Sequence, residues 1–380
     1  MTQNLIGSYG PWAANIVGAR PGRLSLRSGN FKNVAAWRKQ ATARVWDCLA
    51  APELPATPKV RVEARGEFDG LSWERLSWQL PWGPRTDAVF LKPLKTKPGQ
   101  RLPAILGLHD HGGKKYFGWR KIAQIGPVVH PLISEHRECY GGLAWANEAA
   151  HRGYAVLVHD TFPFGSRRVR VADVLPVIAG KGVDPADNES NGIAAYNEWA
   201  GDHEHLMAKS LFCAGTTWPG VYLRDDQAAL SVLCARNEVD PARVACGGLS
   251  GGGMRTVFLA GLDPRVRSCF CAGFMTTWRD FLLNKAWTHT WMTYVPLLPR
   301  DLDFPEILGL RAPKSTLVLN CNADPLYTLK GMKDAGSILK DVYKRAGAAD
   351  AIRVSFYEGG HEFNPEMQAE AFKWFERGLK

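Results

Sequence analysis

The sequence of 380 residues has no apolar run approaching the roughly 18 to 20 residues of a membrane-spanning helix. Residues 1–20 lack a basic start followed by a continuous apolar core, so no secretory signal is expected. No nucleic-acid-binding motif, internal repeat or low-complexity segment is present. These absences predict an ordinary globular chain with neither a membrane nor a nucleic acid as its partner.

The sequence also lacks any C-x-x-C pair, although it contains eight cysteines. Four of them stand inside apolar, strand-like runs: Cys246, Cys269, Cys271 and Cys321. That placement is typical of free, buried thiols in a reducing compartment rather than of a disulfide framework. A cytoplasmic location is therefore expected.

No H-E-x-x-H or comparable metal-binding spacing occurs. Potential ligands do exist; they are His109, Asp110, His111, His159, Asp160, His203 and His205. We interpret His109 and His159 as hydrogen-bonding residues at a sheet edge. The sequence predicts no catalytic metal and no cofactor.

The formal charge of +10 is unevenly distributed, because residues 1–60 hold eight Lys/Arg against two acidic residues. A nucleic-acid-binding arm would need an accompanying motif, which is missing. A solvated face or a subunit contact is the preferred interpretation. The sequence leaves open whether the chain forms a homo-oligomer.

Strand-like and helix-like segments alternate along most of the chain. Apolar or alternating runs predict strands at 59–68, 71–82, 87–93, 102–113, 154–160, 244–246, 266–274, 315–324 and 351–360. Helical spacing predicts helices at 31–51, 143–153, 223–237, 328–347 and 365–380. This order indicates a doubly wound, mostly parallel α/β sheet with helices on both faces, and 59–93 form an antiparallel edge.

The predicted organisation is an N-terminal arm and amphipathic helix at 1–58, followed by a catalytic domain at 59–380. Residues 1–30 are expected to be irregular. Two excursions, at about 162–222 and 276–314, leave the carboxyl ends of strands, where open α/β sheets bind ligands.

The two excursions are expected to build or cover the substrate pocket. Residues expected to contact the substrate are Arg167, Trp278, His289 and Trp291. Together with Trp218, Trp287 and Tyr294, the tryptophans predict an aromatic-lined pocket that favours short acyl groups.

The central motif is Gly248-Leu249-Ser250-Gly251-Gly252, which matches G-x-S-x-G between a buried strand and an apolar helix. In this nucleophile elbow a serine occupies a strained strand-to-helix turn. The positions two before and two after the serine must lack a Cβ, because the turn crowds them. Ser250 is therefore the predicted nucleophile.

A serine nucleophile needs a base and an orienting carboxylate, which follow it in this order: Ser, Asp/Glu, His. Asp324 ends one later strand and His361 ends the next. The oxyanion hole needs backbone N–H donors. One is expected at Gly251, and the other at His111 or Gly112, in the loop after the strand AILGLHD.

The segments LHDHGG, GGLSGGG, LRAPKSTLVLNCNADPLY and FYEGGHEF resemble those of α/β-hydrolases of the dienelactone hydrolase-related and acetyl xylan esterase-like group. The likeness spans about 31–380 and implies esterase activity on acylated sugars or other small esters. Asp110 follows His109 where relatives often have His-Gly. Dienelactone hydrolases proper use a cysteine nucleophile, so Ser250 argues against that activity.

The predicted function is a serine carboxylic ester hydrolase whose partner is a small-molecule ester. One alternative is a peptidase or amidase of the same fold, although such enzymes usually carry a propeller domain, for which residues 1–85 are too few. Another is a non-catalytic hydrolase-like binding protein, in which the histidine would lie far from the serine.

Overall fold

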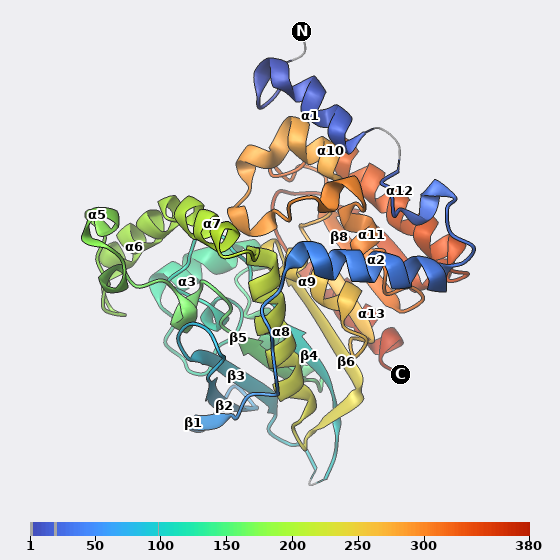
Figure 1. Cartoon of the computed structure of the whole chain (residues 1–380). Coiled ribbons are helices and arrows are strands. Elements are labelled where there is room, and N and C mark those ends of the chain that lie inside the picture. Colours follow the sequence, from blue (N-terminus) through green and yellow to red (C-terminus); the bar gives the residue numbers. More distant parts are fainter. Residues whose placement is uncertain (1–2, 19–20, 98) are drawn as a thin grey trace.

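A computed structural model describes residues 3–18, 21–97 and 99–380. Its described residues form a nine-stranded sheet in the order β1-β2-β3-β5-β4-β6-β7-β8-β9 (Figure 1). The strands are β1 (Arg61–Phe68), β2 (Leu71–Trp78), β3 (Thr86–Pro93), β4 (Leu102–Gly107), β5 (Ala155–His159), β6 (Val239–Leu249), β7 (Ser268–Ala272), β8 (Ser315–Cys321) and β9 (Ile352–Tyr357). All nine fall within or overlap the segments predicted from the sequence.

The antiparallel edge lies where it was predicted. Strands β1, β2 and β3 pair antiparallel, and β3 pairs antiparallel with β5. From β5 through β4 and on to β9 every pairing is parallel. The carboxyl ends of β4, β6, β8 and β9 therefore share one edge, which brings distant sequence segments together.

Helices cover both faces of the sheet, which confirms the predicted α/β architecture. The α-helices are α1 (Gly10–Val17), α2 (Val34–Leu49), α3 (Pro131–His136), α4 (Trp145–His151), α5 (Pro176–Ala179), α6 (Ser190–Asp202), α7 (Glu204–Cys213), α8 (Trp218–Cys234), α9 (Gly251–Leu262), α10 (Trp278–Asp280), α11 (Phe304–Gly309), α12 (Leu329–Arg345) and α13 (Pro365–Gly378). Apolar residues of α2, α8, α9, α11 and α12 pack on one face of the sheet, and those of α4 and α13 on the other.

The central strands are buried on both faces. Leu106 and Cys246 belong to the hydrophobic core on the face covered by α8 and α9. Their neighbours Ile105 and Ala245 belong to the core on the face covered by α4 and α13. Successive strand residues point to opposite faces, so a strand covered on both sides must be apolar at every position. That is the reason for the continuous apolar runs in the sequence.

The N-terminal segment is more ordered than predicted. Residues 10–17 form α1 rather than an irregular arm, and α1 lies beside α10 (Figure 1). Trp37 of α2 is buried in the main core. The proposed boundary at residue 58 stays a prediction, and residues 1–2 and 19–20 of this segment lie outside the described residues.

Several basic side chains of the N-terminal segment are neutralised within the chain. The guanidinium groups of Arg23 and Arg44 lie 2.8 and 2.6 Å from the Asp301 carboxylate. Arg38 donates from Nε to the carbonyl oxygen of Leu310 at 2.6 Å. These side chains attach the segment to the second excursion, although the Arg23 side chain remains 71% exposed.

The first excursion is largely helical, since it contains α5, α6 and α7, which extend to one side of the sheet in Figure 1. The second contains α10, several short helical turns and α11.

The four cysteines that were expected to be free and buried form no disulfide and are all buried. Within the described ranges, no helix is long and apolar enough to cross a bilayer.

Candidate active site

Ser250 occupies the predicted turn between β6 and α9. Its backbone has φ 58° and ψ −118°, a conformation rare for a residue with a side chain, so the turn is strained. A Cβ on Gly248 or Gly252 would lie 2.0 or 2.1 Å from the carbonyl oxygen of Leu108. Only glycine fits at both positions, which explains the spacing of the motif. The helix that begins at Gly251 directs its free N–H groups toward the serine.

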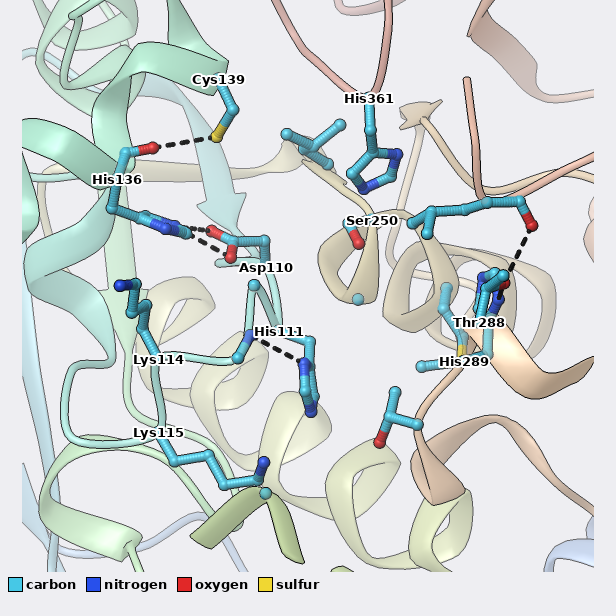
Figure 2. Close-up of a pocket in the computed structure, with 18 of the residues that line it drawn as sticks. Asp110, His111, Lys114, Lys115, His136, Cys139, Ser250, Thr288, His289 and His361 are labelled. Atoms are coloured by element: carbon cyan, nitrogen blue, oxygen red, sulfur yellow. Dashed lines mark hydrogen bonds and ion pairs between the residues drawn. The ribbon is translucent and has the colours of Figure 1, made fainter. Parts of the chain in front are cut away.

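Asp324 and His361 form a hydrogen-bonded pair after β8 and β9. His361 Nδ1 lies 2.7 Å from Asp324 Oδ2, and Asp324 Oδ1 accepts the N–H of Leu326 at 2.9 Å. The pairing with a carboxylate fixes the imidazole proton on Nδ1. His361 Nε2 has no hydrogen-bond partner among the described residues. Figure 2 shows this imidazole directly next to Ser250, and both residues line one cavity.

The loop after β4 brings a backbone amide to the elbow. A Cβ on Gly251 would lie only 2.8 Å from the backbone nitrogen of His111. A Cβ on Gly112 would instead contact His136 and the Asp110 carboxylate, both at 2.4 Å. The geometry therefore favours His111 over Gly112 as the second amide beside the serine.

A buried charge cluster holds this loop in place. The Asp110 carboxylate accepts hydrogen bonds from Tyr140 Oη at 2.6 Å and His136 Nε2 at 3.0 Å, and Lys121 Nζ lies 3.5 Å away. Burial raises the pKa of Asp110, but His136 and Lys121 outweigh it and hold that pKa well below its ordinary value. Lys121 Nζ also donates to the carbonyl oxygens of Asp110 and His111 at 2.9 and 2.8 Å. The aspartate that departs from the His-Gly pattern thus anchors the loop.

A second buried network joins the elbow helix to the same loop. Arg255 of α9 donates to the carbonyl oxygen of His109 at 3.1 Å, and its guanidinium pairs with Asp226. His159 Nε2 lies 3.0 Å from the Asp226 carboxylate. His159 is therefore a hydrogen-bonding residue at the sheet edge, as expected, and His109 Nδ1 lies 3.0 Å from the carbonyl oxygen of Asp110. No three His, Cys, Asp or Glu side chains in the described ranges are grouped so that they could hold a metal.

The cavity above Ser250 has a volume of about 780 Å³, and both polar and apolar side chains form its walls. Its charged lining residues are Asp110, Lys114, Lys115, Glu135, Glu138, Glu198 and Glu204. Its aromatic lining residues, besides histidines, are Phe274, Trp287 and Tyr327. The prediction of an aromatic-lined pocket was therefore wrong in its residues, apart from Trp287.

His289 lines the cavity opposite His111, as Figure 2 shows. Its Nε2 lies 2.7 Å from the Tyr327 hydroxyl and its Nδ1 lies 2.7 Å from the Thr288 hydroxyl. Burial, with His361 and His111 nearby, lowers the pKa of His289 to about 3. The ring is therefore neutral at physiological pH and fixed in position.

The other three predicted substrate-contacting residues are not in the cavity lining. Trp278 is buried against Phe304, with ring centroids 3.7 Å apart. Trp291 donates its backbone N–H to Glu204, but its ring lies outside the lining. Arg167 is 2% exposed and forms an ion pair with Asp225 at 3.0 Å. Sequence position placed these side chains near the edge but could not fix their direction.

Arg167 is expected to stabilise the fold without taking part in binding. Its guanidinium also donates to the carbonyl oxygen of Pro84 at 2.6 Å. Substitution of Arg167 by Met should lower the free energy of unfolding by about 3–5 kcal/mol, because it leaves Asp225 buried without its cation. Urea unfolding measures this loss, and kcat/KM should stay within about twofold of wild type.

The matched control is Arg170→Met, since Arg170 is exposed in the same segment. This change should alter the free energy of unfolding by no more than about 0.5 kcal/mol. A tenfold rise in KM for Arg167→Met, without a loss of stability, would restore the substrate-binding interpretation.

Sequence reasoning missed several polar residues of the cavity. Glu204, Lys115 and Asn197 are buried to at least nine-tenths and line it. They belong to no motif, and Glu204 and Asn197 lie in the first excursion, at about 162–222. Helical spacing of apolar residues across 190–213 was the available signal, since it would have shown helices with one buried face.

The sequence is similar to that of a known bacterial protein. No family model matches the chain. "Putative hydrolase YtaP" of Bacillus subtilis (strain 168) is 26% identical over 298 residues, which cover 78% of this chain and 84% of that protein.

Solved structures show the same fold. A "putative acetyl xylan esterase" from Bacteroides fragilis NCTC 9343 superimposes with a TM-score of 0.67 at 15% identity, covering 93% of this chain and 83% of its own. A glucuronoyl esterase from Solibacter usitatus gives 0.62 at 16%, covering 95% and 98%. The predicted resemblance is confirmed for the fold: the chain has the α/β-hydrolase fold of these esterases.

Proposed function

We propose that this chain is a serine hydrolase that cleaves carboxylic esters of small or sugar-type substrates through an acyl-enzyme. The observation that carries the proposal is the convergence of Ser250, the Asp324–His361 pair and the His111 amide on one cavity. The esterase names of the structural neighbours support the same reaction class.

In the proposed mechanism Ser250 Oγ attacks the ester carbonyl carbon while His361 Nε2 takes its proton. The backbone N–H groups of Gly251 and His111 hold the negative oxygen of the tetrahedral intermediate. The intermediate collapses, and the alcohol leaves with the proton from His361. A water molecule then attacks the acyl-enzyme by the same route, and the carboxylic acid is released.

Two buried polar groups in the cavity wall support a hydroxylated substrate. Asn197 and Thr293 are 7% and 0% exposed and line the cavity. Asn197 Nδ2 and Thr293 Oγ1 have no hydrogen-bond partner among the described residues. Buried groups of this kind favour a ligand that supplies hydrogen-bonding partners, such as the hydroxyl groups of a sugar.

An esterase is favoured over a propeller-type peptidase by the N-terminal strands. Strands β1 to β3 extend the central sheet rather than form a separate domain over the cavity. The non-catalytic alternative is weakened because His361 lies next to Ser250 (Figure 2).

The proposal predicts a preference for short acyl groups, now for a different reason. Each methylene gains about 0.8 kcal/mol only when it is buried against apolar surface. Charged side chains such as Lys114 and Glu135 form part of this cavity's wall and offer a longer chain no such burial. For p-nitrophenyl esters, kcat/KM should peak at about two to four carbons and be roughly tenfold lower at eight.

A fluorophosphonate probe should label Ser250 in the same preparation, as read from the mass of the elbow peptide. The proposed function fails if no ester is turned over and Ser250 stays unlabelled. A steady rise of kcat/KM through eight carbons would leave the enzyme class intact but contradict the polar cavity as the basis of selectivity. Clear preference for a matched anilide would indicate an amidase.

A further inference from the structure

Glu204, the first residue of α7, lies where three segments of the cavity wall meet. Only 6% of the residue is exposed. One carboxylate oxygen, Oε1, lies 2.5 Å from His111 Nε2 and 2.6 Å from Lys115 Nζ. The other, Oε2, accepts the Thr290 hydroxyl at 2.6 Å and the Trp291 N–H at 3.3 Å. One side chain from the first excursion therefore binds the loop after β4 and the second excursion.

The contact with Glu204 fixes the tautomer of His111. His111 Nδ1 accepts the backbone N–H of Gly113 at 3.1 Å, so the ring proton must lie on Nε2. That proton is donated to Glu204 Oε1. Burial, with Lys115 nearby, lowers the pKa of His111, so the ring stays neutral at physiological pH. The imidazole thus closes the turn 111–113 on one side and joins α7 on the other.

The same histidine supplies the backbone N–H beside Gly251. Lys121 Nζ donates to the carbonyl oxygen of His111, and Glu204 accepts from its imidazole. Figure 2 shows His111 between the elbow and Lys115. We propose that Glu204 is a positioning residue that holds His111 so that its backbone N–H faces the oxyanion formed at Ser250. This inference rests on the proposed function and assigns a residue outside the triad to the oxyanion hole.

The key variant is Glu204→Gln, which keeps the size of the side chain. Its amide has one acceptor oxygen and one donor nitrogen, while all four groups around Glu204 are donors. If the amide nitrogen faces His111, the ring loses its acceptor. If the oxygen faces it, a neutral oxygen shared with Lys115 replaces the carboxylate, so the contact is weakened in either orientation. Removing an oxyanion donor outright costs about 10²–10³-fold in kcat, so misplacing one should cost about 10–100-fold. KM should stay within about twofold, because the amide acts on the transition state.

His111→Ala is the second variant, since it keeps the backbone N–H and removes only the imidazole. If both residues act through their shared contact, it should lose kcat to a similar degree. The double variant should then lose little more than either single variant. Additive losses would show independent roles and overturn the proposal. If Glu204→Gln does not fold, His111→Ala still tests it: an unchanged kcat would overturn it.

Glu370→Gln is the matched control. Glu370 of α13 is a part-buried carboxylate that accepts the hydroxyl groups of Ser355 and Tyr357 and pairs with Arg353, outside the cavity lining. It should change kcat by less than about twofold. A trifluoromethyl ketone mimics the tetrahedral intermediate. Its affinity should fall together with kcat in Glu204→Gln and stay unchanged in Glu370→Gln. A fall of that affinity to the same degree in Glu370→Gln would indicate a general structural effect and overturn the assignment.

A spectroscopic readout separates this inference from the proposed function. Nitrogen-15 NMR of histidine-labelled protein should show His111 as the Nε2–H tautomer in wild type. This state should be lost or mixed in Glu204→Gln and unchanged in Glu370→Gln. If wild type turns over no ester, the proposed function fails, while the tautomer still reports on the His111–Glu204 contact. A wild-type His111 protonated on Nδ1 would overturn the inference directly.

Discussion

Substitution of Ser250 by alanine is expected to lower kcat for p-nitrophenyl acetate by about 10⁴–10⁶-fold, because the acyl-enzyme can no longer form. The residual rate would come from the backbone amides, which still stabilise an oxyanion formed by direct attack of water. The fold should be retained, since the strained turn is held by the glycines and by the Ser250 N–H, which donates to the Ala272 carbonyl oxygen at 2.9 Å.

The matched control is Ser231→Ala. Ser231 of α8 donates its hydroxyl to the Gln227 carbonyl oxygen at 2.8 Å, far from the elbow. Its kcat should equal that of wild type within about twofold. Initial rates and the release of p-nitrophenol in the first turnover measure both variants. Turnover by Ser250→Ala within tenfold of wild type would exclude Ser250 as the nucleophile.

The second large effect is expected for Asp324→Asn, which should lower kcat about 10³–10⁴-fold near neutral pH. The new amide would satisfy the Leu326 N–H through its oxygen, so its NH₂ group would face His361. A donor at that place favours the tautomer with the proton on Nε2. That nitrogen could then not accept the proton of Ser250. KM should change little, because ester binding does not require the proton transfer.

Asp240→Asn is a close structural match for this substitution. Asp240 also accepts the N–H two residues later, from Ala242 at 3.0 Å, and pairs with Arg243 at 2.7 Å. It lies in β6 near the end opposite Ser250. Its kcat should be that of wild type. Equal losses in the two aspartate variants would mean that Asp324 acts through stability alone, which thermal unfolding would reveal.

Most of the proposed triad was predictable because its residues carry signals in the sequence, namely a glycine motif and the ends of strands. The elbow needs glycine at two fixed positions around Ser250, and both close contacts are made to one carbonyl oxygen, that of Leu108. Asp324 and His361 follow consecutive parallel strands, and parallel strands end at the same edge. Strand order and motif spacing therefore predict that these residues lie close together at one edge of the sheet.

The residues around the triad were not predictable in the same way. His111 was preferred over Gly112 only once the packing of the loop against Gly251 and His136 was known. Arg167 and Trp278 stand in excursions that reach the sheet edge, yet both side chains turn away from the cavity. A sequence pattern gives the position of an excursion, but the direction of each side chain depends on partners that the pattern does not identify.

By itself, the sequence determined the alternation of strands and helices, the antiparallel edge and the strained turn at Ser250. The first two follow from periods of 2 and 3.6 residues, which act between near neighbours, and the third follows from glycines at fixed positions around Ser250. Only the tertiary structure decided that Arg167 meets Asp225, 58 residues away, and that His111 meets Glu204, 93 residues away. Buried charges must find partners wherever packing brings them, and that choice is made by the whole fold.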